Sequence, residues 1–265
     1  MSWLLELFQV STDQELIDRM TLVAVGWTVF VGLYTFFFPA PYGRYTTSWV
    51  GPCLPAKLAW LVQEIPVCIA IALLRFVTPS KLISNPGNFI PVTLVVAHYV
   101  NRAIIYPLKL NSNAKPVPLL TILSAFLFCS YNGIFQGHHL LNVGMVEGLP
   151  FVVAGSLIFV LGMAVNIHHD DLLRDLRKSS EKGSKQEYKI PHGGLFDYIS
   201  GANYFGEILE WWGLALVTRQ NPQIIFAVFT SIFLGLRAIR HHAWYKEKFG
   251  EKYPSSRTAV IPFLL

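Results

Sequence analysis

Apolar runs of about 20 residues, the length that an α-helix needs to cross the hydrocarbon core of a bilayer, recur along almost the whole chain. Stretches rich in proline, glycine and asparagine, such as FFPAPYG and VTPSKLISNPGN, separate these runs. We therefore predict an all-α, polytopic membrane protein that forms a bundle of seven transmembrane helices. The predicted spans are residues 20–38, 56–77, 88–108, 117–143, 149–173, 204–218 and 223–240.

The composition excludes a water-soluble globule. Of the 265 residues 53% are hydrophobic and 14% are charged, whereas soluble domains carry about a quarter charged residues. The first 19 residues carry acidic groups and no basic segment, so we expect no cleaved secretory signal. The three cysteines lie in or beside apolar runs without metal-ligand spacing, so no metal site is expected. No basic block with interleaved aromatic residues indicates a nucleic-acid partner.

The distribution of lysine and arginine predicts how the chain is oriented. The loops after the first, third and fifth predicted spans carry most of the basic residues, and the C-terminal tail adds more. By the positive-inside rule these loops and the C-terminus face the cytosol, in a bacterial inner membrane or an endoplasmic reticulum. The last segment, residues 244–265, is amphipathic, and we expect it to lie in the interface or to fold over the helix ends.

Polar residues interrupt the second predicted span near its middle, where Gln63 and Glu64 are followed by Pro66. A charged side chain at the bilayer centre costs about 2.5–3.5 kcal/mol, so this pair is expected to face a protein interior. No lysine or arginine lies within a turn, and removal from water favours a neutral carboxyl group. We therefore expect Glu64 to be at least partly protonated and, beside the Gln63 amide, to bind a carbonyl oxygen in an apolar cavity. Pro66 frees the carbonyl of Val62 and bends the cavity wall.

Four other polar stripes recur at helical spacing, and the cost of polar groups in lipid again predicts that they face a shared interior. Two alternatives remain open. Two glutamates of the first stripe can pair with arginines only to hold helices together, and the second stripe can be a solvated ladder of charges at a helix end. The stripes are Asn203, Glu207 and Glu210; Asn166, Asp170, Arg174 and Arg177; Tyr99, Arg102 and Tyr106; and Arg237, His241 and Tyr245.

Six motifs in a fixed order carry a resemblance to a known family. They are WLVQEIP (60–66), AHYVNRAIIYP (97–107), LGMAVNIHHDDLLRDLRK (161–178), YKIPHGGLFDYISGANYFGEILEW (188–211), FLGLRAIRHHAWY (233–245) and YPSSRTAVIPFLL (253–265). With these motifs the chain resembles the membrane steroid 5α-reductases over nearly its full length. The sequence has no GxGxxG after a strand, so a Rossmann cofactor site is absent. The resemblance implies instead that a single membrane-embedded domain, residues 1–265, binds NADPH within a seven-helix bundle.

The resemblance also implies a role for each matched position. Glu64 and Tyr99 would bind the 3-keto oxygen of a 3-oxo-Δ4 steroid, with Gln63 as a further catalytic residue and Trp60 lining the same pocket. Hydride would reach C5 from the α face, and a proton would reach C4. Residues 20–143 would form mainly the steroid pocket, and residues 149–265 mainly the cofactor site. The implied cofactor residues are Arg102, Asn166, Asp170, Arg177, Tyr188, Asn203, Glu207, Arg237, His241, Tyr245 and Arg257.

The chain departs from the family at residues 137–139, where Gly-His-His replaces a frequent Gly-Tyr-Tyr, and in the loop 110–116. We also expect the polar loop 179–186 to act as a lid over the cofactor. The expected partners are a steroid or steroid-like lipid and membrane lipids, without an obligate protein partner.

Three other functions stay open at this point. The chain can reduce another activated lipid double bond, such as that of an enoyl thioester or a polyprenoid. It can be a membrane methyltransferase that binds S-adenosylmethionine, but this leaves Glu64 and Tyr99 without a role. It can also be a transporter or lipid-binding protein, although no internal repeat of the kind that many transporters carry is visible.

Overall fold

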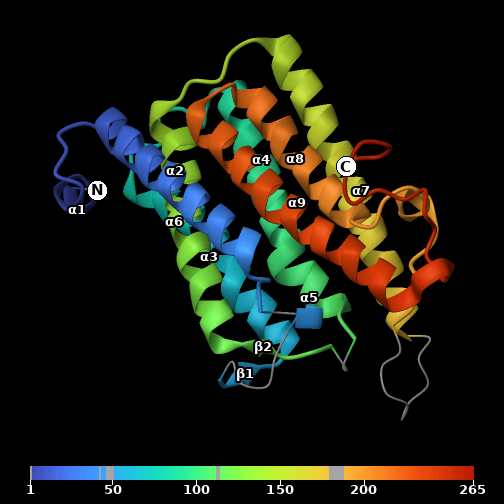
Figure 1. The fold of residues 1–265 in the computed structure, drawn as a ribbon. Helices are drawn as coiled ribbons and strands as arrows, with labels where there is room; N and C mark the ends of the chain where they lie inside the picture. Colours follow the sequence, from blue (N-terminus) through green and yellow to red (C-terminus); the bar gives the residue numbers. More distant parts are fainter. Residues whose placement is uncertain (1, 42, 46–50, 112–113, 179–187) are drawn as a thin grey trace.

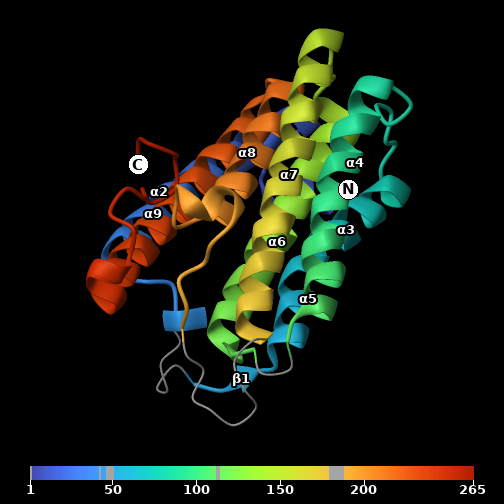
Figure 2. The ribbon, with the colours of Figure 1, turned by 90° about the vertical axis from the view of Figure 1, so that its right-hand side faces the viewer.

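The computed structural model describes residues 2–41, 43–45, 51–111, 114–178 and 188–265, except for the side chains of residues 2–4, 177 and 178. The predicted lid at 179–186 and the side chain of Arg177 therefore lie outside the described part. Long helices run side by side and make up almost the entire molecule (Figures 1 and 2). The helices are α1 (Ser2–Leu7), α2 (Asp13–Phe37), α3 (Ala56–Val77), α4 (Pro86–Val100), α5 (Tyr106–Lys109), α6 (Leu119–His138), α7 (Leu149–Lys178), α8 (Ala202–Thr218) and α9 (Asn221–Phe249).

Several short elements connect the helices. A π-helical turn, Asn101–Ile105, joins α4 to α5, and a second one, His139–Val143, extends α6. Two short strands, β1 (Cys53–Leu54) and β2 (Val117–Pro118), pair antiparallel and tie together the segments that precede α3 and α6. Single 3-10 turns lie at Gly43–Tyr45, Gly194–Asp197 and Gly250–Lys252.

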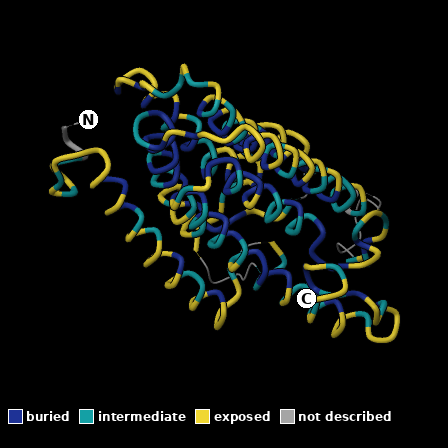
Figure 3. Tube along the Cα trace, turned by 90° about the horizontal axis from the view of Figure 1, so that it is seen from above, coloured by how far each residue is buried: buried dark blue, intermediate teal, exposed yellow. Residues whose placement is uncertain are grey.

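The predicted class of an all-α, multi-pass membrane protein is confirmed. Six helical stretches of the described chain are long and apolar enough to cross a membrane, and α3 has the predicted bounds. Large apolar side chains of α2, such as Phe30 and Phe37, are exposed, as expected for contact with lipid. Figure 3 shows exposed positions along this helix. The count of seven is not confirmed, because α8 has 17 residues and rises only about 25 Å, less than the hydrocarbon thickness of about 30 Å.

The first and last predicted spans are shorter than the helices that contain them, because each helix continues at its polar end. Helix α2 begins at Asp13 rather than at residue 20, because Thr12 caps it by accepting a hydrogen bond from the Glu15 amide at 3.2 Å. Helix α9 continues past residue 240 to Phe249. Its last two turns are polar, and the protein covers one side of them: Tyr245 is buried, and Trp244 packs against Tyr188 with ring centroids 4.9 Å apart, whereas Lys246 and Lys248 are exposed. Residues 244–249 thus belong to a long helix and not to a separate terminal segment.

The tail after α9 folds back over the segment that precedes α8, one of the two arrangements predicted for it. The amides of Ser200 and Gly201 donate to the carbonyls of Thr258 and Ala259, each at 2.9 Å, and the Thr258 amide donates to the Tyr198 carbonyl at 3.0 Å. These bonds fix the loop that leads into α8, and α8 carries one of the polar stripes.

Helices α7 and α8 approach each other so closely that only glycine fits at four positions of their contact. A Cβ atom added at Gly206 would lie 2.4 Å from the backbone nitrogen of Asn166, and one at Gly162 would lie 2.5 Å from that of Glu210. Gly155 and Gly213 make the same kind of contact one heptad further along. Small residues at such spacing allow close helix packing in membranes. The close approach brings the polar stripes of the two helices into direct contact.

We expect Gly206→Ala to destabilise the protein by about 1–3 kcal/mol, because the added methyl group overlaps the backbone of α7. The measurement is the thermal unfolding midpoint in detergent. Gly235→Ala on α9 is the matched control, since no atom lies within 4 Å of its added Cβ. The control is expected to leave the midpoint unchanged or to raise it, because alanine is the better helix former. Equal midpoints for the two variants would contradict this account of the contact.

Candidate active site

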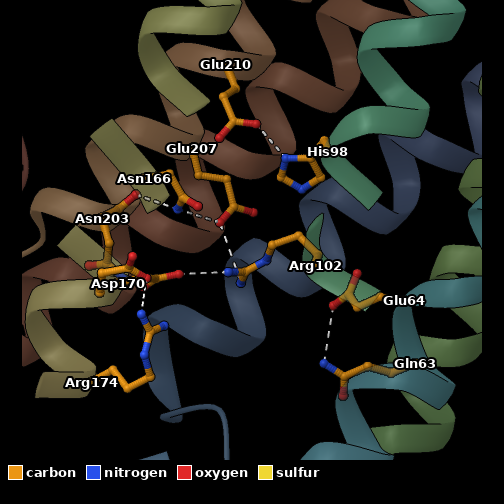
Figure 4. A network of polar contacts seen from close by, with 11 residues as sticks. Gln63, Glu64, His98, Arg102, Asn166, Asp170, Arg174, Asn203, Glu207 and Glu210 are labelled. Carbon is orange, nitrogen blue, oxygen red and sulfur yellow. Dashed lines mark hydrogen bonds and ion pairs between the residues drawn. The ribbon is translucent and has the colours of Figure 1, made fainter. Parts of the chain in front are cut away.

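The centre of the candidate site is Arg102, which lies on the π-helical turn after α4. Its Nη1 atom lies 3.0 Å from Asp170 Oδ2 on α7, and its Nη2 atom lies 3.7 Å from Glu207 Oε2 on α8 (Figure 4). The three side chains are only 12%, 9% and 16% exposed, respectively. Buried charges require partners of this kind. The Arg102 guanidinium thus joins three helices through their polar residues.

Two side-chain amides complete this group, which we call the polar core: Arg102, Asn166, Asp170, Asn203 and Glu207. Asn203 Nδ2 donates to Asp170 Oδ1 at 2.9 Å. Asn166 Nδ2 donates to the Asn203 carbonyl at 3.0 Å and lies 3.5 Å from Glu207 Oε2. The stripes of α7 and α8 therefore face each other as predicted. Asp170 is buried, so a solvated charge ladder does not describe it.

A buried pair that the sequence did not single out adjoins the polar core. His98 Nδ1 lies 2.5 Å from Glu210 Oε2, and both side chains are almost completely buried. The His98 ring packs against Tyr99 and Trp211, with centroid distances of 5.1 and 4.5 Å. Glu210 belongs to a predicted polar stripe, but a single histidine on another helix carries no spacing signal. Only the fold brings the two together.

The predicted substrate residues Gln63 and Glu64 lie on the other side of Arg102, on α3 (Figure 4), and Tyr99 lies on α4. Gln63 Nε2 donates to Glu64 Oε1 at 3.2 Å, and the Cys129 thiol on α6 donates to Glu64 Oε2 at 3.6 Å. Glu64 thus faces α6 and not lipid. Tyr99 is 3% exposed, and its hydroxyl oxygen accepts a hydrogen bond from Asn132 Nδ2 at 3.1 Å.

Trp60 connects the two sides of the site. The Arg102 guanidinium lies 4.8 Å from the centre of the Trp60 ring and 4.9 Å from that of Tyr106. Such cation–π contacts hold an arginine in a defined position. Arg102 therefore contacts a predicted substrate residue and the acidic residues of the polar core at the same time.

A second cluster of predicted residues lies where α9 ends, and Arg44 is at its centre. Arg44 Nη2 donates to the Tyr245 hydroxyl at 3.0 Å, and its guanidinium lies 4.3 Å from the centre of the Trp244 ring and 5.6 Å from that of Tyr188. The sequence indicated Arg44 only as one of the basic loop residues, because its loop has no periodic pattern. We call Arg44, Tyr188, Trp244 and Tyr245 the aromatic cluster.

Arg237 and His241, also on α9, continue from the aromatic cluster toward α8. Arg237 Nε donates to the Tyr204 hydroxyl at 2.9 Å, and the His241 ring lies 5.5 Å from the rings of both Tyr204 and Tyr45. Burial raises the pKa of the Tyr45 phenol, so this ring stays neutral at physiological pH. The fourth predicted stripe therefore faces the bundle interior along its whole length.

Arg257 has a different environment from the other predicted cofactor residues. Its Nη1 atom donates to the Pro191 carbonyl at 2.9 Å, and its Nη2 atom lies 3.1 Å from His192 Nδ1. The side chain is 1% exposed, and the tail that carries it is bound to the same loop. In this structure Arg257 therefore holds the tail, and it reaches the aromatic cluster through Tyr253, whose ring stacks on Tyr245 at 5.4 Å.

Several buried polar atoms of the residues described above have no hydrogen-bond partner within the described part of the chain. They include Glu210 Oε1, an acceptor beside the polar core, and Arg44 Nη1, a cationic donor in the aromatic cluster, as well as Arg257 Nε and the Tyr45 hydroxyl. Buried polar atoms are rarely left unpaired in proteins, and a bound ligand is one way to satisfy them. An acceptor at one end and a guanidinium at the other match a ligand with an amide group and phosphates. A nicotinamide dinucleotide has both, so the residues present fit this class of cofactor.

The chain is similar to known proteins over nearly its full length. The family model for 3-oxo-5-alpha-steroid 4-dehydrogenase matches residues 115–265. Human 3-oxo-5-alpha-steroid 4-dehydrogenase 2 is 42% identical over 266 residues, which cover 97% of this chain and 99% of that protein. Rat 3-oxo-5-alpha-steroid 4-dehydrogenase 1 is 42% identical over 231 residues, which cover 85% of this chain and 86% of the rat protein. The protein with these motifs and this helical bundle therefore belongs to the 3-oxo-5-alpha-steroid 4-dehydrogenase family of membrane oxidoreductases.

Proposed function

We propose that this protein reduces the C4=C5 double bond of 3-oxo-Δ4 steroids to give 5α-dihydrosteroids, with NADPH as the cofactor. Membership of the family supports the reaction class. The observation that carries the proposal is the position of Arg102, which contacts Trp60 on one side and the polar core on the other. A steroid held at Glu64 and a cofactor held at the polar core would then meet beside one arginine.

In this proposal Glu64 and Tyr99 bind the 3-keto oxygen and stabilise the negative charge that develops on it. The Glu64 carboxyl group and the Tyr99 hydroxyl would each donate a hydrogen bond to this oxygen, and Gln63 Nε2 holds the Glu64 carboxyl group at 3.2 Å. Polarising the carbonyl withdraws electrons from C4=C5 and leaves C5 electrophilic. Donors that are fixed before the reaction, in a site closed to water, lower the barrier because they need no reorganisation. The resulting enolate then takes a proton at C4, which comes ultimately from solvent, and the ketone is restored.

The proposed cofactor residues extend from the polar core to the aromatic cluster. When bound, NADPH supplies the hydride that reaches C5 from the α face of the steroid. The polar core and the Glu210 acceptor would hold the amide end, whereas arginines near the end of α9 would bind the phosphates. The residues that would hold NADPH are Arg102, Asn166, Asp170, Arg177, Tyr188, Asn203, Glu207, Arg237, His241, Tyr245 and Arg257, and we add Arg44 and Glu210 to this proposed set.

We infer that the C-terminus and the aromatic cluster face the cytosol, from the surplus of lysine and arginine on this side. A soluble, anionic dinucleotide would enter there, whereas the steroid would enter from the membrane. Residues 20–143 would supply mainly the steroid pocket and residues 149–265 mainly the cofactor site. An endoplasmic reticulum membrane and a bacterial inner membrane both satisfy this arrangement.

The test is NADPH oxidation by the purified protein in detergent or lipid, followed by absorbance, with and without testosterone or progesterone. We expect oxidation that depends on the steroid and a product with 5α stereochemistry. If an enoyl thioester or a polyprenal supports turnover and no 3-oxo-Δ4 steroid does, the substrate assignment is wrong. The assignment of the protein as an NADPH-dependent reductase then still holds. If no acceptor of these classes oxidises NADPH, the proposed activity is wrong.

Arg177→Ala is expected to raise the dissociation constant for NADPH about tenfold or more, as for a lost charge-assisted hydrogen bond to a phosphate. Steroid turnover at saturating NADPH should change little. The measurement is NADPH binding followed by tryptophan fluorescence. Arg75→Ala is the control, because Arg75 is an exposed arginine in the last turn of α3, at the opposite end of the bundle. An unchanged affinity would remove Arg177 from the cofactor site.

A further inference from the structure

Helix α6 presents two polar side chains to the two groups that would bind the steroid ketone. Cys129 and Asn132 are three residues apart and therefore share one face of the helix. Cys129 contacts Glu64 on α3, and Asn132 contacts Tyr99 on α4. Both side chains are almost fully buried, with 4% and 3% exposure. One face of α6 thus reaches both proposed catalytic groups, although neither of its residues stands in a motif that carried the family resemblance.

The contact with Tyr99 fixes the direction of its hydroxyl hydrogen. Asn132 Nδ2 is the donor, and the Tyr99 oxygen is the acceptor, at 3.1 Å. A phenol has one hydrogen to donate. Because Asn132 approaches the oxygen with a hydrogen of its own, the hydrogen of Tyr99 is turned away from Asn132. It is then available for an acceptor in the site, such as a ketone oxygen.

The contacts with Glu64 act in the same way. Gln63 Nε2 donates to Oε1 at 3.2 Å, and the Cys129 thiol donates to Oε2 at 3.6 Å. Both neighbours approach the carboxyl group through donors, so each of its two oxygen atoms is held by one neighbour. A thiol is a weak donor, so Cys129 contributes less than an amide does. Together the two contacts hold the plane of the carboxyl group.

The packing of α6 against α3 makes these contacts precise. A Cβ atom at Gly133, beside Asn132, would lie 2.8 Å from Val67 Cα, and one at Gly137 would lie 2.9 Å from Ile71 Cγ1. The two helices therefore cannot separate or slide without a loss of close packing. Cys129 also lies in the same buried apolar cluster as Val67 and Tyr99.

We propose that Cys129 and Asn132 are positioning residues, which orient the donor groups of Glu64 and Tyr99 toward the oxygen atom of the substrate. This inference rests on the proposed function, because it assigns no reaction of its own. Asn132 acts through Tyr99, and Cys129 acts through Glu64. Neither residue belongs to the polar core or to the aromatic cluster, so we expect effects on steroid turnover and not on cofactor affinity.

The test is a double-mutant cycle between Asn132→Leu and Tyr99→Phe, with kcat measured for a 3-oxo-Δ4 steroid at saturating NADPH. Each single variant is expected to lower kcat, Asn132→Leu by about tenfold and Tyr99→Phe by about 100-fold or more. The double variant should fall no further than Tyr99→Phe alone, since Asn132 then has no hydroxyl to orient. The dissociation constant for NADPH should stay unchanged in all three. If the loss of kcat in the double variant equals the product of the two single losses, the inference is wrong. It is also wrong if Asn132→Leu has a normal kcat.

Three further variants keep the inference testable if Asn132→Leu does not fold. Asn132→Ser is smaller and remains polar, but its hydroxyl is too short to reach Tyr99, so the same cycle applies. Cys129→Ser keeps a donor and should stay within about threefold of the native kcat, whereas Cys129→Ala should lose more. If Cys129→Ser and Cys129→Ala are equally active, Cys129 is not a positioning residue. If Tyr99→Phe is fully active, Tyr99 does not bind the ketone and this part of the proposed function is wrong. This outcome differs from a failure of the positioning inference, in which Tyr99→Phe loses activity and Asn132→Leu does not.

Discussion

Replacing Glu64 with alanine is expected to lower steroid turnover by about 100- to 1,000-fold, the loss that follows removal of one donor from an oxyanion-type site. The reason is that Glu64 would donate to the ketone oxygen where negative charge develops. NADPH binding should remain within about twofold of the native protein, because the polar core and the aromatic cluster keep their residues. The measurements are kcat with a 3-oxo-Δ4 steroid and the dissociation constant for NADPH.

Two variants calibrate this result. Glu64→Gln keeps a side chain that can donate through its amide, so it should retain more activity than Glu64→Ala. Glu147→Ala removes an exposed carboxylate in the loop before α7 and should behave as the native protein. A Glu64→Ala variant that turns over steroid normally but binds NADPH weakly would show that the two sites have been exchanged.

Replacing Arg102 with methionine is expected to destabilise the protein by about 3–5 kcal/mol, as for a buried ion pair that loses one partner. Asp170 and Glu207 would then face each other across the polar core without the guanidinium between them. The thermal unfolding midpoint in detergent measures the loss. Arg75→Met, at an exposed site, is the control for removal of an arginine.

A triple variant separates stability from function at the same site. Arg102→Met combined with Asp170→Asn and Glu207→Gln removes the unpaired charges, so its midpoint should return toward that of the native protein. Its NADPH affinity and steroid turnover should stay low, since the proposed cofactor contacts are also lost. A single Arg102→Met variant with a native midpoint would mean that water or mobile ions screen the two carboxylates.

The parts of the fold that the sequence predicts well are those whose surroundings are lipid. Helix α3 has the predicted bounds because Pro55 precedes it and its apolar run ends at the VTPS turn. The end of α9 was predicted too early, since the turns that carry Trp244 and Tyr245 are polar but packed against other parts of the chain. Hydropathy alone does not distinguish a polar helix end in water from one covered by protein.

The residues of the candidate site likewise include some that the sequence predicts and some that it does not. Asn166, Asp170, Asn203 and Glu207 follow the helical period, and this period predicts that each pair shares a face. The contacts of His98 with Glu210 and of Asn132 with Tyr99 join residues that are 112 and 33 positions apart. Contacts at such separations depend on which helices are neighbours, and no local pattern in a single sequence specifies this.

The glycine contacts between α7 and α8 limit how the bundle can open. Because the two backbones touch at Gly155, Gly162, Gly206 and Gly213, neither helix can rotate or shift past the other without steric overlap. They must move as one rigid body, carrying four of the five polar-core residues in unchanged register. Any widening that admits a large molecule therefore takes place along the seams that this pair forms with its neighbours, and a cross-link between α7 and α8 should leave ligand entry intact.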